Sequence, residues 1–238
     1  MRRNFTFALA SLLALSACDR SDPPSDSIKN AMDTAVEEVA GTAPAKMAEG
    51  PFAPQDGCAD LEGAAEFRNR LAQAVEARDT AALLALTSDD VRLDFGGGSG
   101  HATLSERLGD SEYGLWKELE AILPLGCALA EGGGIVMPSY FAKTLGSRDA
   151  TMSMIVTGER VPLHKAAAAN SEVLQSISWD AVELDGGLRP DQEFQKVRLI
   201  DGTEGFIETA MLRSYLAHRL LASSRDGTWA ITAFVAGD

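Results

Sequence analysis

The second half of the chain, from about residue 152, consists of short apolar runs separated by turn residues. Runs of this length, spaced about ten residues apart, are typical of the strands of a small β-barrel. Asp201 and Gly202 favour a tight hairpin turn between two of the runs, because both central positions of such a turn adopt positive φ. The runs occupy residues 154–156, 161–163, 173–174, 181–184, 196–199 and 205–207.

The last two apolar runs flank a second Asp-Gly pair. Residues 219–221 and 229–234 lie on either side of Asp226 and Gly227. This pattern predicts a C-terminal hairpin, which we group with the barrel in a domain spanning residues 151–238.

Residues 58–150 are expected to form a mainly helical domain. Apolar residues recur at helical spacing along one predicted helix, at Leu61, Phe67, Leu71 and Val75. Thr103 and Glu106 have the spacing of a capping box, which predicts the start of another helix. Residues 91–95 alternate as a short strand does and lead into a glycine run. The whole chain is therefore expected to be α+β, a mostly helical N-terminal part followed by the barrel and its closing hairpin.

The N-terminus has the pattern of a bacterial export signal. Arg2 and Arg3 precede a mainly apolar run of about 13 residues, which is shorter than the roughly 20 needed to cross a bilayer. The next residues, Leu15-Ser16-Ala17-Cys18, resemble the lipobox of bacterial lipoproteins. The resemblance implies that residues 1–17 are a signal peptide and that Cys18 carries lipid, with acyl chains such as palmitate. The alternative is ordinary cleavage that leaves a free thiol.

Lipidation would place the protein in the bacterial cell envelope, anchored to a membrane and facing the periplasm. Asp19 resembles the sorting residue that retains lipoproteins in the inner membrane, so it favours that membrane. Residues 18–57 contain paired prolines and few aromatics, which predicts a flexible tether.

Two cysteines remain once Cys18 is assigned to lipid. In an oxidising compartment Cys58 and Cys127 are expected to form a disulfide. Such a bond closes a loop of about 70 residues, worth about 4 kcal/mol in the chain-entropy model. The alternative is a pair of buried free thiols.

The chain is strongly acidic. Its formal net charge is −14, and removal of residues 1–17 takes away two arginines and no acid. Such a surface repels nucleic acid, so nucleic acid is not an expected partner.

Residues 156–213 resemble a bacterial SH3-like (SH3b) domain, chiefly in the segment 194–207 with its Lys196-Val197 and Gly205-Phe206-Ile207. The chain after residue 58 is also similar to a group of uncharacterised envelope proteins, through residues 90–97, 115–119 and 229–238. The SH3b resemblance implies a ligand groove, for which the candidate residues are Trp179, Phe194 and Phe206. The sequence departs from the family in having phenylalanine at both usual tryptophan positions.

No motif for catalysis, metal or cofactor binding is present in the sequence. There is no Gly-x-Ser-x-Gly, and the three histidines are far apart. We therefore expect a binding or structural module for peptidoglycan peptide or an envelope protein. One alternative is an envelope hydrolase using His101 or Asp94, the latter buried with a raised pKa. The other is a small-ligand protein with an enclosed apolar cavity under Trp116 and Phe95.

Overall fold

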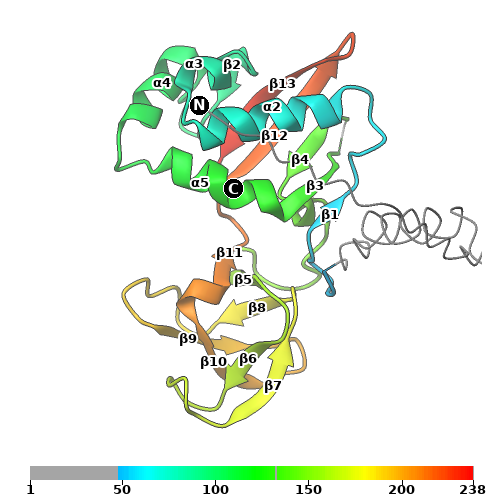
Figure 1. The fold of residues 1–238 in the computed structure, drawn as a ribbon. Coiled ribbons are helices and arrows are strands. Elements are labelled where there is room, and N and C mark those ends of the chain that lie inside the picture. The colour runs from blue at the N-terminus through cyan, green and yellow to red at the C-terminus, as the bar shows by residue number, and fades with distance from the viewer. Residues whose placement is uncertain (1–47, 132, 238) are drawn as a thin grey trace, which may run out of the picture. The chain divides into compact units, whose positions relative to one another are not determined.

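The computed structural model describes residues 48–131 and 133–237, which contain two β-sheets and four α-helices. The fold is α+β, as expected (Figure 1). The predicted signal peptide, Cys18, Asp19 and the first part of the predicted tether lie outside the described residues. None of the helices in the described part is long and apolar enough to cross a membrane.

The first sheet has six strands in the order β1-β3-β4-β12-β13-β2. The terminal hairpin pairs antiparallel through β12 with β4 and parallel through β13 with β2. Asp226 and Gly227, with φ of 50° and 78°, form its turn as predicted. The strands are β1 (Gln55–Asp56), β2 (Thr87–Arg92), β3 (Gly126–Leu129), β4 (Ile135–Met137), β12 (Arg219–Arg225) and β13 (Thr228–Val235).

The helices share one hydrophobic core with this sheet. Figure 1 shows α2 and α5 running across β12 and β13. Leu71 of α2 and Leu119 of α5 pack in the same buried cluster as Leu220 and Ile231 of the hairpin. Because side chains alternate along a strand, the intervening residues point to the other face of the sheet. The helices are α2 (Ala64–Glu76), α3 (Thr80–Leu84), α4 (Gly100–Gly109) and α5 (Leu115–Ile122).

The second sheet has seven strands in the order β11-β5-β8-β9-β10-β6-β7, all paired antiparallel. Val156, Leu163 and Val197 are fully buried in its own core. β9 and β10 form the predicted hairpin, joined by residues 199–203; Gly202 has φ 85°, but Asp201 does not adopt the positive φ that a two-residue turn requires. The strands are β5 (Ser153–Val156), β6 (Val161–His164), β7 (Val173–Ile177), β8 (Ala181–Leu184), β9 (Phe194–Arg198), β10 (Glu204–Glu208) and β11 (Leu212–Ser214).

The predicted barrel is not closed. The order of the seven strands begins at β11 and ends at β7, and the described strands contain no pairing between these two. Four of the five residues of β7 are exposed, including the apolar Val173 and Leu174.

The terminal hairpin belongs to the six-stranded sheet, although the sequence grouped it with the barrel. Leu220, Ala222, Ile231 and Phe234 give it an apolar face that the helices cover, which accounts for its position. Residues 58–150 accordingly contribute β2, β3 and β4 as well as the four helices.

The disulfide between Cys58 and Cys127 is present, as predicted, with both residues fully buried. The predicted tether, however, extended too far toward the C-terminus. Phe52 is only 4% exposed, and its N–H donates to the carbonyl oxygen of Trp179 at 2.8 Å. β1 pairs in parallel with β3, so the chain is already part of the folded unit before residue 57.

Candidate functional site

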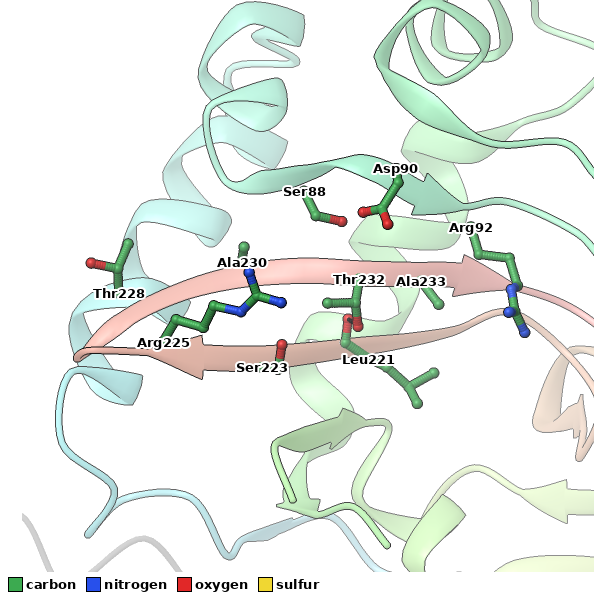
Figure 2. A pocket seen from close by; sticks show the side chains of 10 residues that line it. All are labelled: Ser88, Asp90, Arg92, Leu221, Ser223, Arg225, Thr228, Ala230, Thr232 and Ala233. Atoms are coloured by element: carbon green, nitrogen blue, oxygen red, sulfur yellow. Dashed lines mark hydrogen bonds between the residues drawn. The ribbon is translucent and has the colours of Figure 1, made fainter. Parts of the chain in front are cut away.

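A hollow of about 670 Å³ lies on the face of the six-stranded sheet that the helices leave open. Figure 2 shows the side chains that line it, from three neighbouring strands. They are Ser88, Asp90 and Arg92 of β2, Leu221, Ser223 and Arg225 of β12, and Thr228, Ala230, Thr232 and Ala233, of β13.

The hollow arises from the sizes of the side chains on this face. The central strand contributes Ala230, Thr232 and Ala233, which are small. The longer Arg92 and Arg225 come from the flanking strands β2 and β12 (Figure 2). A strip of small residues between longer ones leaves a shallow depression with polar walls.

The charged groups of the hollow are free to bind a ligand. Arg92, Arg225 and Asp90 are exposed, and none of their side chains has a hydrogen bond or ion pair to another described residue. Six other arginines of this acidic chain do form ion pairs, namely Arg68, Arg78, Arg107, Arg148, Arg198 and Arg213. The hydroxyl oxygen of Ser88 is buried without a hydrogen-bond partner within the described structure.

Two further hollows continue the first along the same face. One, of about 460 Å³, shares Asp90 and Arg92 with it and reaches the glycine run. The other, of about 520 Å³, shares Leu221 and is also lined by Arg219. Arg219 stacks over the rings of Phe95 and Phe141, at 5.7 and 4.9 Å from the ring centres.

Asp94 is not the buried acid with a raised pKa that the sequence suggested. Its carboxylate accepts hydrogen bonds from Arg107 and from the backbone N–H groups of Gly96 and Gly98, the latter two at 2.8 Å. The Arg107 hydrogen bond, followed by that of Gly98, lowers the pKa of Asp94 from 3.8 to about 2. The ionised carboxylate of Asp94 therefore holds the glycine loop in place. The strand pattern of residues 91–95 does not indicate these hydrogen-bond partners, so it could not predict the charge state of Asp94.

His101, the other residue of the hydrolase hypothesis, is engaged elsewhere. Its Nε2 lies 2.8 Å from the hydroxyl of Thr87. No interaction between His101 and Asp94 is present among the described residues, so the structure does not bring the two into one catalytic arrangement. The described residues also contain no group of three or more His, Cys, Asp or Glu placed to hold a metal ion.

The small-ligand hypothesis required an enclosed cavity under Trp116 and Phe95. Phe95 is 53% exposed, so it does not cover such a cavity. Trp116 packs at the edge of the helical core.

The three predicted groove residues occupy different environments. Trp179 packs against the cluster that contains Phe52 and Tyr140. Phe194 is 5% exposed and meets the ring of His164 edge-on at 5.8 Å, so it offers a ligand little surface. Phe206 is half-buried on the adjacent strand β10. A ligand groove at these residues stays a prediction.

A polar cluster that the sequence did not reveal joins α5 to β11 and to the segment between β11 and β12. Glu118 accepts a hydrogen bond from Arg213 at 3.0 Å, and Nδ1 of His218 lies 3.6 Å from the same carboxylate oxygen. His218 first, and then Arg213, lower the pKa of Glu118 from 4.5 to about 2, although burial opposes them. Glu118 and Arg213 are 95 residues apart, so no local pattern could have predicted the pair.

Comparison with known proteins finds no match among protein-family models, curated proteins or solved structures. Any functional inference therefore depends on the residues and their geometry.

Proposed function

We propose that this protein is a lipid-anchored, non-catalytic binding module of the bacterial cell envelope. In this proposal Cys18 carries the anchor, the folded unit faces the periplasm, and the ligand is a peptidoglycan peptide or an envelope protein. The open hollow of the six-stranded sheet is the observation that carries the binding role, because it combines unpaired charges with uncovered polar groups.

The envelope location is supported by three features. The first is the lipobox-like segment ending at Cys18. The second is the disulfide between Cys58 and Cys127, since such bonds persist in oxidising compartments. The third is the resemblance to SH3b domains, which we carry forward as a proposal for the antiparallel strands β5 to β10.

A non-catalytic role fits the way the candidate catalytic groups are used. Asp94 is held ionised by Arg107 and two backbone N–H groups, and His101 contacts Thr87. Both residues therefore have structural partners where a hydrolase would need an acid or base directed at a substrate.

The proposal is tested by incubating the purified, lipidated full-length protein with isolated murein sacculi and, separately, with a detergent extract of envelope proteins. We expect the protein to sediment with sacculi or to retain a specific partner from the extract. Recovery equal to that of a heat-unfolded control in both experiments would refute the binding role.

A further inference from the structure

We propose that the hollow binds a short, extended peptide that carries two or more carboxylates and an amino group. Arg92 and Arg225 each bind one carboxylate, and Asp90 binds the ammonium group. This inference rests on the proposed binding function and assigns it both a site and a ligand class. It also places the site on the six-stranded sheet, away from Trp179, Phe194 and Phe206.

Charge complementarity selects the carboxylates. A guanidinium group offers a planar pair of N–H donors that matches a carboxylate in two parallel hydrogen bonds. Within the described structure, no residue accepts a hydrogen bond from the guanidinium groups of Arg92 and Arg225. On a chain of net charge −14, unpaired arginines on one face provide a local exception to the general repulsion of anions.

The separation of the two arginines sets the length of the ligand. Arg92 lies opposite Ala233 and Arg225 lies opposite Thr228, five residues apart along β13. Five residues of strand span about 17 Å. Figure 2 shows the Arg225 side chain extending over the hollow toward Ala230, which shortens the gap between the guanidinium groups. Three to five residues of extended peptide span about 10 to 18 Å and would bridge it.

Asp90 adds the requirement for a positive group. It lies two residues before Arg92 on the same face of β2, and its carboxylate is exposed and unpaired within the described chain. A ligand with carboxylates alone would be repelled by this group, whereas an amino group between them would pair with it. The hydroxyls of Ser223 and Thr232 also line the hollow. That of Thr232 donates to the carbonyl oxygen of Leu221 at 3.4 Å, so it can accept a hydrogen bond from a peptide N–H, and that of Ser223 can donate or accept.

The size of the hollow favours a short peptide over a folded partner. At about 670 Å³ it falls within the range of small-molecule sites. A stable interface with a folded protein needs about 800 Å² of contact from each partner, which calls for a broader surface than this hollow offers.

The test is isothermal titration calorimetry of the detergent-solubilised full-length protein with the tripeptide L-alanyl-γ-D-glutamyl-diaminopimelate. This tripeptide has three carboxylates and two amines. We expect saturable binding, and at least tenfold weaker binding of the same peptide with its carboxylates amidated. The variant carrying Arg92→Gln and Arg225→Gln should likewise bind the tripeptide at least tenfold more weakly.

The matched control carries Arg70→Gln and Arg160→Gln, two exposed arginines outside the hollow. It changes the net charge equally and should bind like the unmodified protein. Equal weakening in both double variants, or equal binding of the amidated peptide, would overturn the assignment of the site. Circular dichroism melting of each variant establishes that it is folded.

Repeating the sacculus experiment with the Arg92→Gln, Arg225→Gln variant separates the two proposals. If the unmodified protein binds sacculi and the variant binds them equally well, the ligand site inferred here is wrong while the binding function stands. If the unmodified protein binds neither sacculi, envelope proteins nor the tripeptide, both proposals fail.

Discussion

Replacing Glu118 by Gln tests the polar cluster that holds α5 to the segment preceding β12. The fall in the pKa of Glu118 from 4.5 to about 2 corresponds to at most about 3 kcal/mol of stabilisation by the ionised carboxylate. The side chain is 32% exposed, so solvent screening reduces this to about 1–2 kcal/mol. Loss of the charge also leaves the Arg213 side chain, 13% exposed, with a weaker partner.

The pH dependence follows from the direction of the shift. A carboxyl group whose pKa is lower in the folded state contributes its full stabilisation above the unfolded pKa, here 4.5, and loses it as the pH falls toward about 2. The Glu118→Gln variant should therefore be less stable than the unmodified protein at pH 7 and approach it in stability near pH 2.

Urea unfolding at pH 7 and at pH 2.5, with the disulfide intact, measures both effects. Glu120→Gln is the matched control, since Glu120 lies on the same helix but pairs with the exposed Arg78. The Glu120→Gln substitution should lower the free energy of unfolding by less than about 0.5 kcal/mol. Equal costs for the two variants at pH 7, or a Glu118→Gln deficit that is unchanged at pH 2.5, would refute this account of the cluster.

Three further predictions concern the disulfide, the glycine loop and the anchor. Replacing both Cys58 and Cys127 by Ala should lower the free energy of unfolding by up to about 4 kcal/mol, measured by urea denaturation; an unchanged midpoint would contradict the role of the bond. Gly98→Ala would place a Cβ against both the carboxylate of Asp94 and the guanidinium group of Arg107, so it should disrupt their contact and raise the pKa of Asp94 above about 2 in an NMR titration; an unshifted titration would count against this role of Asp94. Cys18→Ser should release the protein from the membrane fraction, as judged by immunoblotting, and continued membrane attachment would disprove lipidation at this residue.

Features governed by neighbouring residues could be predicted from the sequence. Asp226 and Gly227 form a tight turn, and Gly202 supplies the positive φ of the loop between β9 and β10, because these backbone conformations depend on local sterics. The disulfide was predicted by elimination, once Cys18 was assigned to lipid.

Features that depend on contacts between distant parts of the chain could not be predicted from the sequence. The hairpin's apolar alternation fits either sheet equally well, and only its packing against the helices places it beside β4 and β2. The charge state of Asp94 depends on Arg107, 13 residues away, whose contact no local pattern indicated.

The candidate site was missed for a related reason. The sequence predicts a ligand groove at aromatic residues, because the resemblance to SH3b domains implies one there. The hollow is instead lined by small and polar residues between positions 88 and 233, which form no motif and meet only when β2, β12 and β13 pair.

Hydrogen-exchange mass spectrometry of the lipidated full-length protein, with and without soluble murein fragments, tests most directly where a ligand binds. Our account predicts slower exchange in peptides covering β2, β12 and β13. Slower exchange confined to β9 and β10, which carry Phe194 and Phe206, would contradict it.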